Sequence, residues 1–511
     1  MTNWIITPII LPAVVAPFLI LALRHRPRGQ RVVSVGATVL LLAVTIGLYV
    51  LASDGVARPY LLGAWPAPFG IVLVLDRLSA TMLLLTAVLA LAVVLYASAG
   101  WDLRGRHFHV LFQFQLMGIN GAFLTGDVFN LFVFFEVMLI ASYGLLLHGG
   151  GPQRLTAGFH YVAINLVAST LFLFAVGLIY AVTGTLNMAD LAVKVPQVAA
   201  ADQALLRTGA LLLFVVFAIK AALVPLHWWL PTAYSAASAP AVALFMIMTK
   251  VGAYSIMRLY TLVFGAGAGP LGDVAVPWIV PAALATLAIG ALGTLGSRTL
   301  RDLVCFAVVW SMGSLLIAVG LFDAKGLTAA LYYAIHSTLV GAALFLLVDL
   351  VVERRGRWAD RLSASPPIAR EDLLAGLFFL AAIALAGLPP LSGFVGKLMI
   401  LDATRGSPLA AWTWWILLGT SLVVIVALSR AGSVLFWKSR AVDGAADAEA
   451  PRSRRLPFTI VGSLIGSLAL LTALAGPVTR HLEATAMQML DTAGYVQAVL
   501  DLPMPVRTSE R

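Results

Sequence analysis

The stretch FLTGDVFNLFVFFEVMLIASYGLLL, residues 123–147, is long and apolar enough to cross a membrane as one helix, yet it carries Glu136 near its centre. The hydrocarbon layer of a bilayer needs about 20 apolar residues per helical span. Comparable apolar runs recur along all 511 residues, of which 61% are hydrophobic and 11% charged. A soluble domain has about 45–50% apolar and about 25% charged residues. The sequence therefore predicts an all-α polytopic membrane protein.

Hydropathy, together with breaks at glycine, proline and charged residues, predicts about fourteen transmembrane helices. They are expected near residues 4–23, 32–52, 71–97, 107–125, 128–148, 155–182, 205–224, 239–263, 274–296, 301–322, 326–352, 371–402, 411–437 and 455–477. We interpret them as a three-helix N-terminal segment, two five-helix repeats, and a last helix with a tail. The corresponding ranges are 1–106, 107–263, 274–437 and 455–511, with a polar cytoplasmic linker at 438–454.

The formal net charge of +10 comes from arginines and lysines in short loops between the apolar spans. Clusters at 24–31, 104–106 and 354–361 all fall in odd-numbered loops. The positive-inside rule places such loops in the cytoplasm. We therefore expect both termini outside, in a multi-pass protein of the bacterial inner membrane. The basic loops are expected to meet membrane lipid rather than nucleic acid.

A single cysteine, Cys305, rules out an internal disulfide and a cysteine-ligated zinc or iron–sulfur site. The sequence shows no dedicated cage of carboxylates for a cation either. We expect no cofactor and no metal site in this chain, and we expect a transporter subunit rather than an enzyme.

Two predicted spans are interrupted by proline, in KAALVPLHWWLP (220–231) and AGLPPLSGFVGK (386–397). They recur about five helices apart, in corresponding halves of the chain. Interrupted helices in corresponding positions are typical of inverted-repeat transporters whose ion path lies at the breaks. The pattern predicts that helices 4–8 and 9–13 form two inverted repeats, each with one proline-broken helix.

Five ionisable residues lie inside predicted spans, although a charge at a helix centre costs roughly 2.5–3.5 kcal/mol on insertion scales. They are Glu136, Lys220, Lys250, His336 and Lys397. Such residues usually mark an ion or proton pathway. Asp349 and Arg258 lie closer to predicted helix ends, where an interfacial position is expected.

Each of these residues also has a structural interpretation. Glu136 and Lys220 could form a structural ion pair between neighbouring helices. Lys397 could extend to an interface from a helix end, and His336 could simply donate a hydrogen bond to a carbonyl across the bundle. These alternatives stay open at the level of the residues.

The functional hypothesis is a proton relay through internal water. Burial disfavours a charged lysine and a nearby carboxylate favours it, so movement of Glu136 relative to Lys220 would switch that lysine between holding and releasing a proton. Lys250, His336 and Lys397 would pass the proton onward, and histidine is suited to relay near neutral pH.

The quoted stretch 123–147 resembles the signature helix of the D subunit of Mrp-type monovalent cation/proton antiporters. KAALVPLHWWLPTAYSAASAP (220–240) and AGLPPLSGFVGKLMI (386–400) resemble the broken seventh and twelfth helices of the wider superfamily, which includes the antiporter-like subunits of respiratory complex I and membrane hydrogenases. The resemblance implies that Glu136 and Lys220 are the family's essential pair. It further implies relay roles for Lys250, His336 and Lys397.

One departure from the family pattern concerns the residue five positions after His336. Many relatives carry a lysine there, where this chain has Gly341. This variant resembles the potassium-linked (Pha-type) branch.

The resemblance implies a hetero-oligomeric complex, with other Mrp-type subunits as partners, that exchanges internal Na+ or K+ for external protons. The competing interpretations are a proton-pumping subunit of complex I or of a membrane-bound hydrogenase, and a purely structural membrane scaffold.

Overall fold

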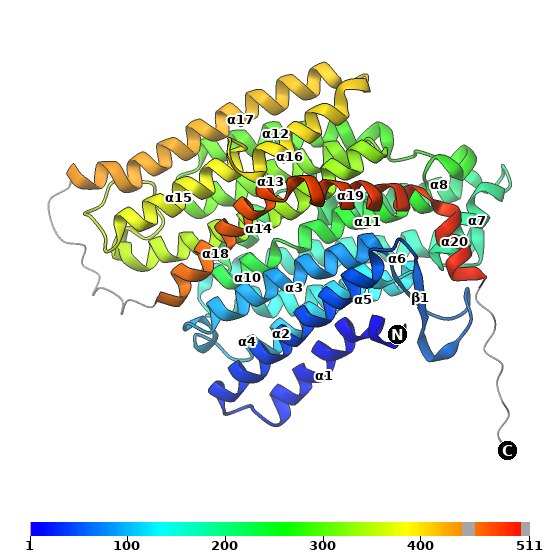
Figure 1. The fold of residues 1–511 in the computed structure, drawn as a ribbon, viewed down its shortest axis with the longest axis horizontal. Coiled ribbons are helices and arrows are strands. Elements are labelled where there is room, and N and C mark those ends of the chain that lie inside the picture. Colours follow the sequence, from blue (N-terminus) through cyan, green and yellow to red (C-terminus); the bar gives the residue numbers. More distant parts are fainter. Residues whose placement is uncertain (1, 442–454, 502–511) are drawn as a thin grey trace.

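The computed structural model describes residues 2–441 and 455–501, and it consists almost entirely of helices packed side by side (Figure 1). Within these residues, twelve helices are long and apolar enough to cross a membrane. The predicted class, a polytopic α-helical membrane protein, is confirmed. The count of fourteen stays a prediction, because α4 (Phe108–Leu124) and the two parts of the broken helix, α15 (Glu371–Ala386) and α16 (Ser392–Ala403), are each shorter than a full span.

The N-terminal segment contains α1 (Thr7–Leu21), α2 (Pro27–Ala52) and α3 (Arg77–Ala97). The prediction that a helix begins at residue 71 is wrong, because β2 (Val72–Leu75) pairs antiparallel with β1 (Arg58–Leu61). Asp76 then starts α3 with a capping box: Ser79 N donates to Asp76 Oδ1 at 2.8 Å, and Asp76 N donates to Ser79 Oγ at 2.9 Å. A capping box satisfies two backbone donors at a helix start, so it fixes the beginning of α3 after Asp76.

The rest of the chain forms two successive groups of helices. After α4, the first group continues with α5 (Val128–Leu147), α6 (Pro152–Thr183), α7 (Met188–Lys194), α8 (Gln203–Lys220), α9 (Trp229–Ala236), α10 (Ala239–Phe245) and α11 (Met248–Leu262). Around α15 and α16, the second group has α12 (Val276–Gly296), α13 (Leu300–Val319), α14 (Ala324–Arg355) and α17 (Ala410–Gly432). The chain closes with α18 (Arg455–Ala473), α19 (Ala475–Leu490) and α20 (Thr492–Leu500). The predicted linker 438–454 is described only as far as residue 441.

Close helix contacts recur in the two groups with the same spacing. A Cβ added at Gly118 on α4 would lie 2.5 Å from Met138 N on α5, and one at Gly290 on α12 would lie 2.4 Å from Trp310 N on α13. One turn away, a Cβ at Gly121 would lie 2.2 Å from the Phe134 ring, and one at Gly293 would lie 2.2 Å from the Phe306 ring. Small residues let helix backbones approach closely in membranes. This correspondence supports the predicted pair of repeats; their inverted orientation and exact domain boundaries stay predictions.

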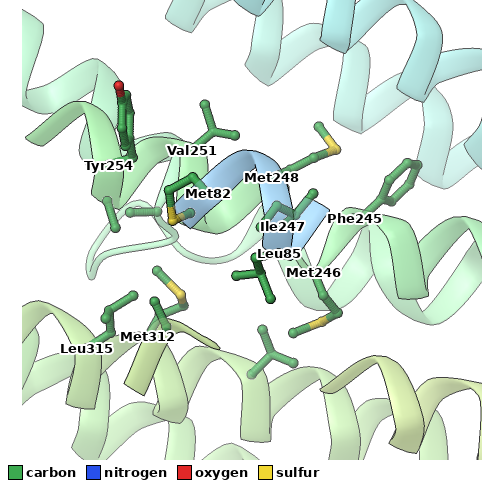
Figure 2. Close-up of a cluster of buried hydrophobic side chains, with 14 of the residues drawn as sticks. Met82, Leu85, Phe245, Met246, Ile247, Met248, Val251, Tyr254, Met312 and Leu315 are labelled. Atoms are coloured by element: carbon green, nitrogen blue, oxygen red, sulfur yellow. The ribbon is translucent and has the colours of Figure 1, made fainter. Parts of the chain in front are cut away.

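The centre of the bundle is formed by α11, α13 and α14, whose apolar residues are nearly all buried, whereas α1, α6 and α17 expose many. Figure 2 shows the apolar cluster between α3, α10, α11 and α13. Four methionines contribute to it: Met82, Met246, Met248 and Met312. Flexible thioether side chains fill irregular space of this kind, here around the short interruption between α10 and α11.

Charged groups from segments far apart in the sequence meet at one end of the bundle. Arg104 pairs with Glu353 at 3.0 Å, and Arg31 pairs with Asp102 at 2.5 Å. Both ends of the described chain lie at the opposite end, where α20 packs against β1 (Figure 1). The placement of both termini outside the membrane stays a prediction.

Candidate functional site

Glu136 and Lys220 are both bound by one face of α6. Ser169 Oγ donates to Glu136 Oε1, and Lys220 Nζ donates to Asn165 Oδ1 at 2.5 Å. Lys220 is 5% exposed, and Glu136 is partly buried. Among the ion pairs of the described residues, none joins Glu136 directly to Lys220. The two side chains therefore bind adjacent positions on one face of α6, and the structural ion pair is not formed in this arrangement.

The position of Lys220 follows from where α8 ends. Pro225 lacks an N–H and cannot continue the helix, and the chain stays irregular until α9 begins at Trp229. Trp229 Nε1 donates to Ile219 O at 2.8 Å, and Ala222 N donates to the same carbonyl at 3.1 Å, so the end of α8 is tied to the start of α9. A lysine at a helix C-terminus is also favoured by the helix dipole. The break thus leaves Lys220 at the end of α8, inside the bundle.

Lys250 on α11 is 1% exposed, and its Nζ has no hydrogen-bond partner among the described residues. The sequence predicted one uninterrupted helix over 239–263, but the helix tightens just before this residue: Ile247 N donates to Leu244 O at 3.2 Å. Such mid-helix irregularity often marks a functional position. At Gly252 an added Cβ would lie 2.7 Å from Ala221 N, so α11 packs directly against the break that follows Lys220.

His336 and Lys397 flank the second break. His336, 1% exposed on α14, shares a 2.9 Å hydrogen bond between Nδ1 and Ser392 Oγ at the start of α16. Its Nε2 has no partner within the described part of the chain. His336 also interacts electrostatically with both Lys250 and Lys397. The histidine is therefore near enough to both lysines to respond to their charge.

Lys397 points into the protein rather than toward a surface. It is 6% exposed, and Nζ donates to Ala386 O at 2.6 Å and to Ser421 Oγ at 2.9 Å. Its Nζ lies 4.0 Å from the centroid of the Trp310 ring. This geometry does not correspond to a lysine that extends to an interface.

Gly393 lets α15 and α16 approach each other beside His336. A Cβ there would lie 2.0 Å from Ala384 O and 3.0 Å from His336 Nε2. Gly393→Ala is therefore expected to displace the second break and to lower transport partially, measured as cation-dependent proton movement in vesicles. Gly376→Ala is the control, because no atom lies within 4 Å of a Cβ added there. Equal activity of the two variants would contradict this role of Gly393.

The space beside Gly341 is already occupied. A Cβ added there would lie 2.3 Å from Met246 Cε, so a lysine at this position would have to displace that side chain. The departure from the family pattern is thus accommodated by packing, and Met246 belongs to the cluster in Figure 2.

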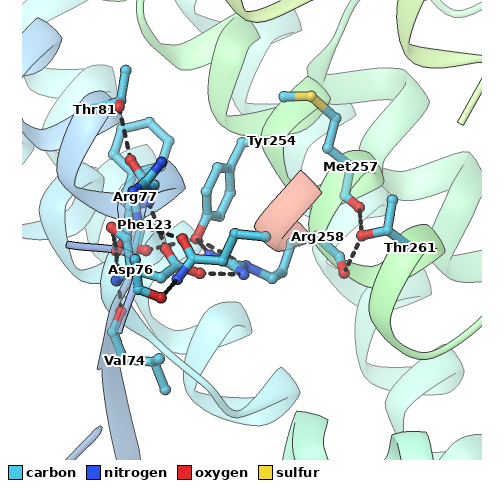
Figure 3. A network of polar contacts seen from close by, with 12 residues as sticks. Val74, Asp76, Arg77, Thr81, Phe123, Tyr254, Met257, Arg258 and Thr261 are labelled. Carbon is cyan, nitrogen blue, oxygen red and sulfur yellow. Dashed lines mark hydrogen bonds and ion pairs between the residues drawn. The ribbon is translucent and has the colours of Figure 1, made fainter. Parts of the chain in front are cut away.

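Several polar groups that the sequence analysis placed elsewhere or omitted are buried and paired. Arg258, expected near an interface, forms a 2.6 Å ion pair with Asp76, with side-chain exposures of 6% and 4% (Figure 3). Tyr254 OH donates to Phe123 O at 2.6 Å beside this pair. Asp349 Oδ2 accepts hydrogen bonds from two aromatic residues at the opposite end. Asn165 and Ser169, which the sequence did not single out, are two polar residues one helical turn apart in an apolar span.

The described residues contain no cluster of three or more His, Cys, Asp or Glu side chains that could hold a metal ion. The chemistry available at the two breaks is therefore that of lysine, histidine and carboxylate groups with hydroxyl and amide partners. Such an arrangement can hold and pass protons.

This arrangement, two broken helices with buried lysines in a helical membrane bundle, is that of an antiporter-like membrane subunit. Residues 125–426 match the family described as NADH:quinone oxidoreductase/Mrp antiporter, transmembrane. The chain belongs to this family, among the D subunits of Mrp-type antiporters, which confirms the predicted resemblance.

Two curated relatives match almost end to end. The D subunit of a probable K(+)/H(+) antiporter from Rhizobium meliloti is 42% identical, over 98% of this chain and 99% of its own length. The D subunit of a Na(+)/H(+) antiporter from Alkalihalophilus pseudofirmus is 36% identical, over 98% of this chain and 100% of its own length.

Two solved structures share the fold. A chain of the Mrp complex from Dietzia sp. superposes with a TM-score of 0.87 at 30% identity, covering 98% of this chain and 100% of that one. A chain of respiratory complex I from Thermus thermophilus gives a TM-score of 0.77 at 25% identity, covering 96% of this chain and 99% of that one.

Proposed function

We propose that this chain is the proton-translocating subunit of a multisubunit Na+(K+)/H+ antiporter that exports monovalent cations and serves pH homeostasis. The observation that carries the proposal is the row of buried ionisable groups at the two breaks: Lys220, Lys250, His336 and Lys397, with Glu136 beside the first. A scaffold would gain nothing from such groups, because each costs several kcal/mol to bury without compensation.

The row divides into two halves that meet at α11. In the first half, Glu136 and Lys220 both bind one face of α6, and Lys220 ends the helix against which α11 packs. In the second half, His336 interacts electrostatically with both Lys250 and Lys397. Lys250 therefore connects the two halves. Its free Nζ and the free Nε2 of His336, among the described residues, leave both atoms available for water or a proton.

In this proposal, the potential across the membrane supplies the energy for exchange. A charge that enters across the potential is worth about 2.3 kcal/mol per 100 mV. An exchange that brings in more positive charge than it expels can therefore drive cations out of the cell. The cation path itself is proposed to lie partly in other subunits, because the described residues show no metal-binding cluster.

A redox-driven subunit, as in complex I, is the second candidate, and the same row of lysines would serve it. The degree of similarity favours the antiporter, since the K(+)/H(+) antiporter relative is 42% identical and the complex I chain 25% identical.

The function is tested by purifying the tagged chain from its native host in mild detergent. We expect it to co-purify with other membrane subunits, in a complex without flavin or iron–sulfur absorbance. Vesicles containing that complex are expected to move protons on addition of K+ or Na+. The K+ response is expected to be the larger, since the K(+)/H(+) relative shares more residues than the Na(+)/H(+) relative. Soluble redox subunits with such absorbance, and no cation-dependent proton movement, would overturn the proposal.

A further inference from the structure

We propose that Asn165 and Ser169 on α6 are positioning residues that keep Lys220 and Glu136 bound but separate, so that Lys220 can release its proton. This inference rests on the proposed function of the relay. It assigns a role to two uncharged residues that touch the relay groups and do not themselves carry the transported proton.

The two residues present one face of α6 to both relay groups. Residues four apart lie on the same side of a helix, so the Asn165 amide and the Ser169 hydroxyl are adjacent. Asn165 is 2% exposed and Ser169 8% exposed, and neither can replace its partner with bulk water. Asn165 binds Lys220 on α8, and Ser169 binds Glu136 on α5. One helix thus sets the separation between two others.

The amide orientation of Asn165 is fixed by its second hydrogen bond. Its Nδ2 donates to Tyr161 O at 2.7 Å, one turn earlier on α6. With the donor used there, the oxygen is the atom that faces Lys220 Nζ. A flipped amide would lose the bond to the carbonyl and set N–H groups against the ammonium. Asn165 therefore acts as an acceptor for the charged lysine.

The chemistry of these partners explains why separation matters. A charge pair at about 4 Å, in surroundings of effective dielectric about 20, favours the charged form by roughly a thousandfold. Lysine held in that contact would rarely give up its proton. A neutral amide accepts a hydrogen bond from the ammonium, and a hydroxyl donates one to the carboxylate. These neutral partners favour the charged form of the lysine much less than a carboxylate does. Conversion between this arrangement and a direct Glu136–Lys220 contact would then switch the lysine between releasing and holding a proton.

The other titratable groups near this face are phenols and one lysine. Tyr143 on α5 and Tyr161 on α6 have ring centroids 5.5 Å apart, and Tyr234 lies on α9. Phenols are uncharged near neutral pH. Lys250 lies on α11, which packs against α8 rather than α6. The charges that act directly on Lys220 and Glu136 at this site are thus each other's.

Two substitutions at Asn165 test the inference. Asn165→Ala removes the acceptor that keeps Lys220 apart from Glu136, so Lys220 is expected to pair with the carboxylate and the pH profile of antiport is expected to shift to higher pH by about one unit. Asn165→Asp places a carboxylate against Lys220 and is expected to shift the profile to higher pH and to lower the maximal rate at least tenfold. Antiport is measured against pH in vesicles that contain the assembled complex, with the amount of this chain measured by immunoblot.

Ser169 offers a test with matched controls. Ser169→Ala is expected to change the pH profile, whereas Ser169→Thr keeps the hydroxyl and is expected to retain the wild-type profile. Ser142→Ala is the control, because Ser142 Oγ forms a buried 3.1 Å bond with Tyr161 OH between the same two helices, away from Glu136. If Asn165→Ala fails to assemble, the Ser169 variants still test the positioning role.

The inference is overturned if assembled Asn165 and Ser169 variants keep the wild-type pH profile, whatever their rates, or if Ser142→Ala shifts it as Ser169→Ala does. Failure of the relay itself would look different. In that case Glu136→Ala and Lys220→Ala would transport normally, which contradicts the proposed function. If those two variants are inactive but the Asn165 and Ser169 variants keep the wild-type pH profile, only the positioning role is contradicted.

Discussion

Antiport by complexes that carry Lys220→Ala is expected to fall to the level of vesicles without the complex, while the subunit remains assembled in the membrane. Lys220 is 5% exposed and is held at the end of α8 by Asn165. Within residues 2–441 and 455–501, the next lysine of the row is Lys250 on α11, which is not at the end of α8 and does not take the place of Lys220. A positioned proton-transfer group contributes about 10²–10⁴-fold to a reaction that depends on it, enough to bring exchange to background.

Lys220→Arg distinguishes a requirement for proton release from a requirement for positive charge at this position. Arginine keeps the positive charge but stays protonated in proteins, so this variant is also expected to be inactive. Lys325→Ala is the matched control, because Lys325 is an exposed lysine at the start of α14. Proton movement on addition of K+ or Na+, followed with a pH-sensitive dye, gives the rate, and immunoblots of the purified complex give assembly. Near-normal antiport in either Lys220 variant would show that protons do not pass through this side chain.

The sequence was sufficient to predict the class of fold and the five relay candidates, and the reason is energetic. Glu136, Lys220, Lys250 and Lys397 stand out because a charge inside an apolar span is costly, so its presence alone is informative. Proline similarly made the two breaks visible. A charge or a proline inside an apolar span can be recognised from the sequence without knowing which helices are in contact.

Features that depend on contacts between distant segments could not be predicted. Asn165 and Ser169 are uncharged, and such residues are common in membrane helices, so only their contacts to Lys220 and Glu136 single them out. The tightened turn before Lys250 contains no proline or glycine to mark it. The β1–β2 pairing requires Val72–Leu75 to meet Arg58–Leu61, and hydropathy cannot distinguish a short apolar strand from the first turn of a helix.

The two breaks also differ in the positions and partners of their lysines, and this difference bears on the direction of proton transfer. Lys220 precedes its break, at the end of α8, whereas Lys397 follows its break, on α16. Lys220 binds an amide and lies near a carboxylate, but Lys397 binds a carbonyl, a hydroxyl and the face of Trp310. The first site therefore has a partner of opposite charge that can capture the protonated lysine, and the second has only neutral partners within the described contacts. This asymmetry suits Lys220 to a switching role and Lys397 to a terminal one.

A second large effect is expected on stability rather than transport, at the buried pair in Figure 3. Asp76→Asn removes the countercharge of Arg258, which lies at 2.6 Å with 6% side-chain exposure. Removing one partner of a buried ion pair typically costs about 3–5 kcal/mol, because the other charge is left uncompensated. Asparagine also caps helices well, so the bond from Ser79 N can persist and the effect reports the charge. The thermal stability and yield of the detergent-purified complex are expected to fall markedly.

The double variant Asp76→Asn/Arg258→Met separates this interpretation from general damage. Apolar replacement of a whole buried pair is often neutral or stabilising, so the double variant is expected to recover most of the stability lost by Asp76→Asn, a non-additivity that only contacting residues show. Asp402→Asn is the control, because its pair with Arg405 is mostly exposed, at 50% and 68%, and exposed pairs contribute little. A double variant less stable than Asp76→Asn alone would mean that Arg258 is held by Tyr254 and its other neighbours and does not depend on Asp76.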